Sequence, residues 1–475
     1  MPSTDIRLRF ALPALFACLA WACAEDPSPP PLQPVPCEPP NRTLTPFTQP
    51  TRPADYHPSF SLDTFATTLP ILVIDTYGAD IVDEPKITAI LEVFDASNPA
   101  ALNRLSHPPT QRARIGIEIR GYSSQSAPKR QFSLAFHDAN GKDQPRPFVG
   151  LPSAADWVLS ATHSDLTMIR NPLTYTLAAA LPRWSPRTRH VEVFLNTSGA
   201  SLSPADYLGL FVITERVQRD PNRVDLPRVD STLPPDANAY LFEFTQRENI
   251  WIHAPWFCGP YSGIKLTFVY PKTPNVQQKD YAQQRFTLLE EALFAHRCQD
   301  FARAVDLDVF ADYHLFNELV LNVDAFRRSL FIQAHPNAPL LLWPLWDFDL
   351  AYRENHPGEL TTWTTAMRVW AHHALHCATY RRVLLQRWTD LRQGPLATAT
   401  IDHTIDTLAS AIRPAALRNI ERWPTALAEN GYTPTTPADL AFDTEIEALR
   451  TFLHTRAAWM DANLPAIEPS PYTGW

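Results

Sequence analysis

The spacing of hydrophobic residues changes near residue 279 and divides the chain into a strand-rich part and a helical part. In the first part, short apolar runs alternate with polar residues at a period of two, which is typical of β-strands. In the second part, apolar residues recur at the helical spacing of three or four. The pattern predicts an α+β fold that is β-rich at its N-terminal side and helical at its C-terminal side. The predicted strands cover residues 69–75, 87–94, 114–120, 131–136, 191–195, 207–215, 239–245, 264–270, 329–333 and 340–350, and the predicted helices cover residues 165–181, 279–297, 306–321 and most of 356–464.

The first 23 residues have the pattern of an export signal. Arg7 and Arg9 form a short basic start, and Phe10 to Ala22 is an apolar run too short to span a bilayer as a helix. A small residue precedes Cys23, as a lipoprotein signal peptidase requires, so we expect Cys23 to carry a lipid. Cys18 is a competing site, and plain secretion is the alternative. The sequence predicts an exported protein, an outer-membrane or cell-surface lipoprotein, whose membrane association is only through this lipid.

Residues 24–58 are predicted to be a Pro-rich linker, because prolines are dense there and the apolar residues show no period. Four cysteines remain after the lipidated one, and an oxidising compartment permits disulfides between them. They allow three pairings, among which the sequence does not choose. These cysteines are Cys37, Cys258, Cys298 and Cys377.

The composition predicts a folded protein and gives no indication of nucleic-acid binding. Of the 475 residues, 45% are hydrophobic, which is enough for a sizeable core. The formal net charge is -9, whereas nucleic-acid-binding domains usually carry a basic face.

Two aspartates in the segment Trp346-Asp347-Phe348-Asp349 are the first candidate for chemistry. In a strand, residues two apart face the same side, so both carboxylates would project together. Adjacent carboxylates repel each other unless a cation holds them, and Mg²⁺ is commonly held by one or two carboxylates with substrate phosphates. The pattern favours a metal site. A polar strand face in water is the alternative, and a metal-dependent hydrolase would use the same pair.

Three other segments contain candidate residues, and each has an ordinary structural explanation when taken alone. Asp324 follows a predicted helix, where it would act as a general base or cap a turn. Residues 120–130 combine a glycine, hydroxyls and basic side chains, as a phosphate cradle or a polar hairpin loop does. Glu215 ends a predicted strand, where it would pair with a buried lysine or face solvent.

Several familiar motifs are absent from the sequence or incomplete in it. His372 and His376 lie one helical turn apart, as metal ligands often do, but no third ligand is evident, so packing is the favoured explanation. The sequence has no Gly-x-Ser-x-Gly elbow, which argues against an α/β-hydrolase. It also has neither a Walker motif nor a Gly-x-Gly-x-x-Gly loop.

Taken together, seven segments resemble the CotH kinase family, and they occur in the family's order over about 230 residues. Each segment alone is a weak signal, whereas the ordered set is specific. The segments are Arg120-Gly121-Tyr122-Ser123-Ser124 with Pro128-Lys129, Val149-Gly150-Leu151-Pro152, Asp156-Trp157-Val158-Leu159, Asp165-Leu166-Thr167-Met168-Ile169-Arg170-Asn171, Gly209-Leu210-Phe211-Val212-Ile213-Thr214-Glu215, Asn322-Val323-Asp324 and Trp346-Asp347-Phe348-Asp349.

The resemblance implies an atypical, minimised protein-kinase-like fold over residues 59–355, with residues 356–475 as a helical C-terminal part of the same domain. It also implies an enzyme that uses ATP and Mg²⁺ or Mn²⁺ to phosphorylate Ser, or Thr, of exported proteins. The implied site consists of Arg120, Ser123, Ser124 and Lys129 at the nucleotide phosphates, Glu215 as the ion-pair partner of Lys129, Asp324 as the catalytic-loop aspartate, and Asp347 with the assistance of Asp349 at the metal.

The chain departs from the family pattern at three places. Arg327, Arg328 and Ser329 occupy the region where many members have an Asn that serves as a further metal ligand, so the sequence supports one metal and leaves a second open. Ala351 stands where a Gly usually follows the aspartates, and a Gly-Gly-Tyr strand entry is reduced to Asn238-Ala239-Tyr240. The assigned carboxylates and Lys129 remain, so these departures do not indicate a loss of activity. Some members of the family act as surface ligands, and the Pro-rich linker and the lipid fit that role too, so a surface adhesion or scaffold protein with weak or no activity is the alternative to an active kinase.

Overall fold

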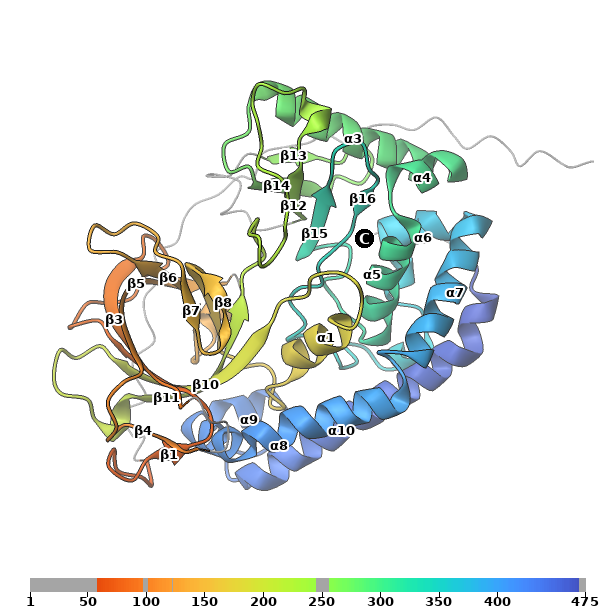
Figure 1. Ribbon diagram of the computed structural model, residues 1–475. Helices are drawn as coiled ribbons and strands as arrows, with labels where there is room; N and C mark the ends of the chain where they lie inside the picture. The colour runs from red at the N-terminus through yellow and green to blue at the C-terminus, as the bar shows by residue number, and fades with distance from the viewer. Residues whose placement is uncertain (1–57, 97–100, 122, 245–255, 470–475) are drawn as a thin grey trace, which may run out of the picture.

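The structure is a computed structural model that describes residues 58–96, 101–121, 123–244 and 256–469. Within these ranges, the side chains of residues 123 and 256–258 are not described. The predicted export signal with Cys23, the linker up to residue 57, and Cys37 lie outside the described residues. The fold is α+β, with most strands in the N-terminal part and most helices in the C-terminal part, as the sequence predicts (Figure 1).

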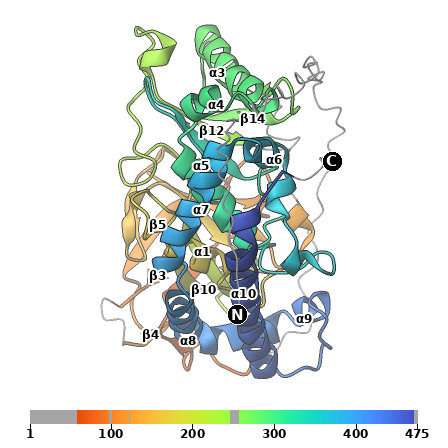
Figure 2. The same cartoon turned by 90° about the vertical axis from the view of Figure 1, so that its right-hand side faces the viewer.

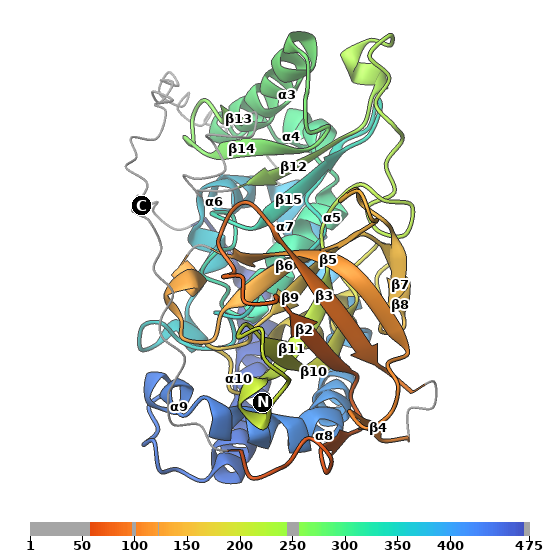
Figure 3. The same ribbon diagram turned by 90° about the vertical axis from the view of Figure 1, so that its left-hand side faces the viewer.

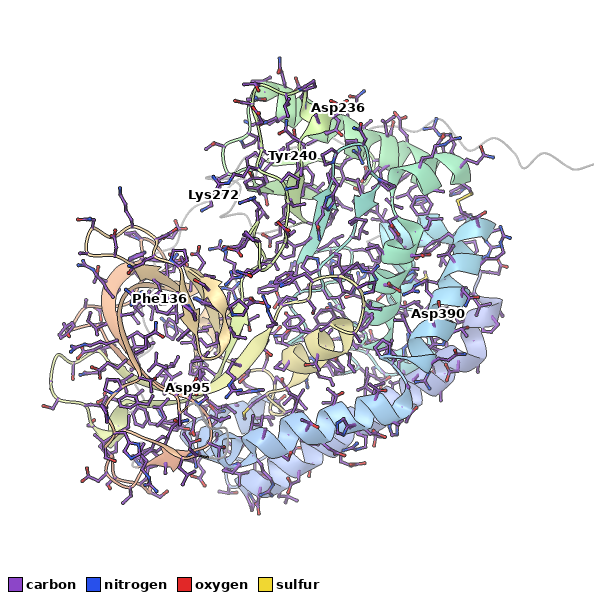
Figure 4. All side chains as sticks on the ribbon, in the orientation of Figure 1. Asp95, Phe136, Asp236, Tyr240, Lys272 and Asp390 are labelled. Atoms are coloured by element: carbon purple, nitrogen blue, oxygen red, sulfur yellow. A yellow bond between two sulfur atoms is a disulfide. The ribbon has the colours of Figure 1, made fainter. Side chains whose placement is uncertain are left out.

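A closed β-barrel forms the N-terminal part. Its strands are β2 (Ile71–Asp75), β3 (Ile87–Phe94), β5 (Gln111–Arg120), β6 (Gln131–His137), β9 (Asp156–Ser160), β10 (Thr188–Asn196) and β11 (Tyr207–Glu215), in the order β10-β11-β9-β6-β5-β3-β2. β10 pairs with β2 in parallel and so closes the ring (Figure 3). Alternate residues point inward, and Phe136 packs there with its ring 5.1 Å from that of Phe148 (Figure 4).

Four short strands lie outside the barrel order and form two small two-stranded sheets. They are β1 (Ala66–Thr67) paired with β4 (Asn103–Arg104), and β7 (Arg146–Phe148) paired with β8 (Leu151–Ala154).

A second, five-stranded sheet lies beside the barrel, and α3 (Val276–Phe294) packs against it (Figure 1). The ring of Phe286 on α3 lies 5.3 Å from that of Phe242 in the sheet, so the two elements share one core. In sheet order the strands are β13 (Trp256–Cys258), β14 (Lys265–Tyr270), β12 (Tyr240–Phe244), β15 (Leu330–Ala334) and β16 (Leu340–Leu341).

α5 (Leu307–Leu319) is buried along almost its whole length and packs against α7 (Ala378–Gln393) and α10 (Ala438–Asn463) (Figure 2). α8 (Thr398–Arg422) leaves this bundle and packs against both β11 and α1 (Arg170–Ala178), so it ties the helical part to the barrel. No helix in the described ranges combines the length and apolar character needed to cross a bilayer. The other helices are α4 (Cys298–Ala304), α6 (Val369–Leu375) and α9 (Thr425–Glu429).

The strand predicted over residues 340–350 is wrong after Leu341, where β16 ends. Pro344 has no amide hydrogen to donate to a neighbouring strand. Asp347 has a φ of 70°, which is not a strand conformation, and its amide donates to the hydroxyl of Tyr175 (3.0 Å). This segment therefore bonds to α1 side chains in place of a sheet.

The helix predicted from residue 165 begins at Arg170 instead. The carboxylate of Asp165 accepts hydrogen bonds from the amides of Thr167 (3.0 Å) and Arg170 (3.0 Å), which stabilises a turn before the helix. Met168 in that turn has a φ of 57°. Pro172 falls in the first turn of the helix, where its missing amide hydrogen costs nothing.

A disulfide joins Cys298, the first residue of α4, to Cys377, the residue before α7. It is one of the bonds that the sequence allows. Because it closes a loop with a sequence separation of 79, we expect its loss to lower the free energy of unfolding by about 2–4 kcal/mol. Urea unfolding of the Cys298→Ser/Cys377→Ser variant against the unchanged protein measures this difference.

The control for the disulfide variant is reductant. Reductant should lower the unfolding midpoint of the unchanged protein toward that of the double variant. Equal midpoints for the oxidised protein and the double variant would contradict the prediction.

Candidate active site

A cavity of about 260 Å³ lies between the barrel, the start of α1, the loop after α5 and the segment after β16. It brings together most of the residues that the sequence singled out, although they come from segments more than 200 residues apart. The predicted residues that line it are Arg120, Ser124, Lys129, Asp324, Asp347 and Asp349. Glu215 is not among the lining residues, and the side chain of Ser123 is not described.

The loop after β5 forms one wall of the cavity, and its tight turn requires a glycine. Gly121 has a φ of 109°, and a Cβ at this position would lie 2.0 Å from the hydroxyl oxygen of Ser124. Gln131 ties the wall together, since its amide nitrogen donates to Ser124 Oγ (2.7 Å) and its amide oxygen accepts from Arg120 (3.4 Å). Gln131 thus holds the hydroxyl of Ser124 next to the guanidinium of Arg120, and both groups can donate hydrogen bonds to phosphate oxygens.

Lys129 is the buried cation of this wall, with 1% of its surface exposed. Its Nζ donates to the carbonyl of Leu210 and to Oδ1 of Asn419 (2.8 Å), and lies 4.3 Å from the centre of the Phe211 ring. Burial lowers the pKa of Lys129 well below its usual value, and the charge of Arg422 lowers it further. A lysine ammonium has three donors, so one remains for a ligand in the cavity.

Asn419 on α8 positions Lys129, and the sequence did not indicate this residue. Its Oδ1 accepts from the amide of Leu210 (3.1 Å) as well as from Lys129. The approach is possible because the next residue back on β11 is Gly209, where a Cβ would lie 2.4 Å from that oxygen. The glycine of the family segment therefore lets a C-terminal helix reach the barrel.

Glu215 does not pair with Lys129, and that prediction is wrong. Its carboxylate is fully buried and binds the guanidinium of Arg187 through both oxygens at 2.7 Å, with Arg223 at 3.7 Å. The cause is the period of two along β11, in which Val212 and Thr214 line the cavity and Glu215 faces the other way. Glu215 stabilises the end of the barrel and is not a ligand of the site.

Asp324 lies on a loop that the end of α5 holds in place. The amide of Asn322 donates to the carbonyl of Asn317 (3.0 Å), and the side chains of these two residues are joined at 2.8 Å. Asn322 Oδ1 in turn accepts from the amide of Asp324 (3.1 Å). Burial raises the pKa of Asp324, the charge of Asp347 raises it further, and Arg328 opposes the rise.

Residues at the start of α1 fix the backbone around Asp347 and Asp349 by hydrogen bonds. This is the structural role of the Asp165-to-Asn171 segment. Asn171 accepts from the amide that follows Asp347 (2.7 Å), and Arg170 donates to the carbonyl of Asp349 (3.0 Å). Ser329 donates its hydroxyl to Asp347 Oδ2 (3.0 Å). The sequence motif indicated that these α1 residues belong to the family pattern, but not what they contact.

Asp347 and Asp349 repel each other, and their carboxylate oxygens are ligands that suit a divalent cation. Burial raises the pKa of Asp349 to about 7, with the charge of Asp347 as the next cause and Arg170 opposing. No group of three or more His, Cys, Asp or Glu side chains in the described residues forms a complete metal cage. Mg²⁺ usually takes only one or two carboxylates and completes its shell with phosphates and water, so Asp347 and Asp349 with the neighbouring Ser329 suit it.

The pair His372 and His376 lies outside this cavity, in a cluster of imidazoles beside the disulfide. His296 stacks on His376 with ring centres 3.8 Å apart, and its Nε2 lies 3.3 Å from Nδ1 of His373. Burial is the main cause that lowers the pKa of His373 to about 3 and that of His376 to about 4. The rings are therefore neutral at pH 7, as stacked packing requires.

A barrel that presents a lysine and a hydroxyl loop to paired aspartates on a helical part defines a kinase-like protein. The family model described as CotH kinase protein matches residues 117–460, more than half of the chain, and the chain belongs to the CotH kinase family. This confirms the family that the seven sequence segments indicated. A search of curated proteins found no match.

Proposed function

We propose that the protein is an ATP-dependent kinase that uses Mg²⁺ or Mn²⁺ to phosphorylate Ser, or Thr, of exported proteins. The observation that carries the proposal is the meeting of two walls in one cavity. Arg120, Ser124 and Lys129 supply donors for phosphate oxygens, and the facing wall supplies Asp324 and Asp347. Phosphoryl transfer depends mainly on positioning and charge neutralisation, and both are available here.

Each residue has a defined task in this reaction. Lys129 and Arg120 bind the nucleotide phosphates, and Asp347 with Asp349 would hold the cation, which neutralises charge on the transferred phosphoryl group. Asp324 accepts the proton of the acceptor hydroxyl, and the oxygen of that hydroxyl bonds to the γ-phosphorus. The bond from that phosphorus to the bridging oxygen breaks, and ADP leaves.

The proposed location is outside the cytoplasm, with the lipid on Cys23 as the anchor. The N-terminal sequence pattern supports export, and so does the disulfide between Cys298 and Cys377, because such bonds persist in oxidising compartments. The acceptor is accordingly an exported or surface protein.

The competing proposal is a surface adhesion or scaffold protein with weak activity. Two observations favour it: the partners of Lys129 Nζ in the described part of the chain are neutral oxygens, and Arg327 to Ser329 occupy the region of the family's metal-binding Asn. Nucleotide binding discriminates between the two proposals.

The test is a thermal-shift series on the full chain with ATP or a non-hydrolysable analogue, with and without Mg²⁺ or Mn²⁺. A kinase should be stabilised by about 2.7 kcal/mol at a nucleotide concentration a hundred times Kd, and only when the metal is present. Lys129→Met should remove the shift because it removes a phosphate donor. Lys142→Met, at an exposed lysine, is the matched control and should keep it.

No shift with any nucleotide and metal, in a protein that unfolds cooperatively, would reject the kinase proposal in favour of the scaffold. A shift that Lys129→Met leaves intact would mean that nucleotide binds elsewhere.

A further inference from the structure

Three arginines lie close enough to Asp324 to act on its carboxylate, and the proposed phosphate transfer uses none of them. Arg327 and Arg328 follow in the same turn, since both of their amides donate to the carbonyl of Asp324, at 3.0 and 2.8 Å. Arg328 lines the cavity together with Asp324. Arg368, the N-cap residue of α6, reaches the loop from the other side and donates to the carbonyl of Val323 (3.2 Å). We call these three residues the arginine cluster.

The position of Arg368 is set by the same helix that sets the position of Asp324. Glu318, near the end of α5, accepts hydrogen bonds from the amides of Thr364 (2.8 Å) and Ala366 (2.7 Å), which lead into α6. Glu318 is itself buried and paired with the buried Arg456. The arginine cluster is therefore built on buried contacts and does not consist of chance surface side chains.

Like charges meet within the arginine cluster. Burial lowers the pKa of Arg368, and the like charge of Arg327 is the next cause, so the two guanidinium groups repel each other. The charges of Asp324, Glu318 and Glu359 oppose this effect on Arg368, although Glu318 is itself paired with Arg456. The buried Nε of Arg368 has no hydrogen-bond partner among the described residues. An anion placed between these side chains would relieve the repulsion and supply acceptors.

The cluster lies next to Asp324, which an acceptor hydroxyl must reach in the proposed reaction, and Arg328 also lines the cavity. All three side chains are only partly buried, so a peptide chain can contact them. A hydroxyl that gives its proton to Asp324 brings its neighbouring residues against the cluster. Basic neighbours would add to the existing repulsion, whereas anionic neighbours would be attracted.

We propose that the acceptor of this kinase is a hydroxyl flanked by anionic groups, recognised by Arg327, Arg328 and Arg368. This inference rests on the proposed kinase function and specifies the substrate class of the same site. Two sources carry the required charge, namely Asp or Glu side chains and phosphoserines left by an earlier phosphorylation.

The experiment compares Ser peptides that differ only in the residues flanking the serine. The four peptides carry Glu, phosphoserine, Asn or Lys at those positions. Binding to the full chain is measured by fluorescence anisotropy with Mg²⁺ and a non-hydrolysable ATP analogue, and transfer is measured with ATP. We expect the anionic peptides to bind about tenfold more tightly than the Asn peptide, as the gain of one charge-assisted contact implies, and the Lys peptide to bind most weakly. The stronger of the two anionic peptides identifies the source of the charge.

The variants assign the preference to the cluster. Arg327→Gln and Arg368→Gln should each raise KM and Kd for the anionic peptide about tenfold while the Asn peptide changes little. Arg327→Glu should shift the preference toward the Lys peptide. Arg303→Gln, at an arginine of α4 with 75% of its side chain exposed, is the matched control and should behave as the unchanged protein.

The outcomes separate the two proposals. Equal binding of all four peptides, or tighter binding of the Lys peptide by the unchanged protein, overturns the inference even if phosphate is transferred. If no peptide is phosphorylated, the kinase proposal fails, and the binding data still decide whether the cluster recognises an anionic segment. Should Arg368→Gln unfold, Arg327→Gln alone decides the assignment.

Discussion

The Asp324→Asn variant is expected to transfer phosphate at least about a thousandfold more slowly than the unchanged protein. The amide cannot accept the proton of the acceptor hydroxyl, and the loop leaves no other carboxylate at that point. The amide hydrogen bonds that Asn322 and Asn317 make do not involve the Asp324 side chain, so the loop should keep its position. Transfer of labelled phosphate from ATP at saturating acceptor measures the effect as kcat.

Nucleotide binding provides the internal control for this variant. The shift in melting temperature caused by ATP and Mg²⁺ should persist, because Asp324 faces the acceptor and not the phosphates in the proposed arrangement. Asp308→Asn, at an exposed aspartate of α5, should leave both measurements unchanged. A rate within tenfold of the unchanged protein would show that Asp324 is not the base.

The Asp347→Asn variant is expected to lose both metal-dependent nucleotide binding and phosphate transfer, the latter also by about a thousandfold or more. An amide oxygen binds a divalent cation far less well than a carboxylate does. In the absence of nucleotide the variant should be at least as stable as the unchanged protein. The reason is that its missing charge no longer raises the pKa of Asp349 or of Asp324.

Asp349→Asn provides the comparison for the metal site. Burial raises the pKa of Asp349 to about 7, which marks the cost of charging it. We expect a smaller loss of transfer and a weaker metal dependence than for Asp347→Asn, measured as the Mg²⁺ concentration at half-maximal rate. A larger loss in Asp349→Asn than in Asp347→Asn would reverse the roles of the two residues.

The sequence alone was sufficient for the fold class, the family and six of the residues that line the cavity. Strands β3 and β11 have the predicted limits, because alternating apolar residues between turn residues leave little freedom for register. The ordered family segments identified Lys129, Asp324 and Asp347 without a structure. Such motifs can be recognised in the sequence because each one is defined by neighbouring residues and needs no contact between distant segments.

The sequence could not supply contacts between segments. The carboxylate of Glu215 stands at the end of a family segment, yet the period of two along β11 turns it toward Arg187 and away from Lys129. Likewise, Asp347 and Asp349 were expected to share a strand face. Their backbone leaves the sheet after β16, and they face the cavity because Asn171 and Arg170 hold them.

Two features of the site depend entirely on long-range packing. Asn419 reaches Lys129 across 290 residues of sequence, through an approach that Gly209 permits. Arg368 joins Arg327 and Arg328 only because Glu318 holds the segment before α6 against the end of α5. The sequence by itself indicated Lys129, Asp324 and the aspartate pair of the site, since motifs are local. The tertiary structure decided which of those groups face one another, since burial and hydrogen bonding between distant elements set the direction of each side chain.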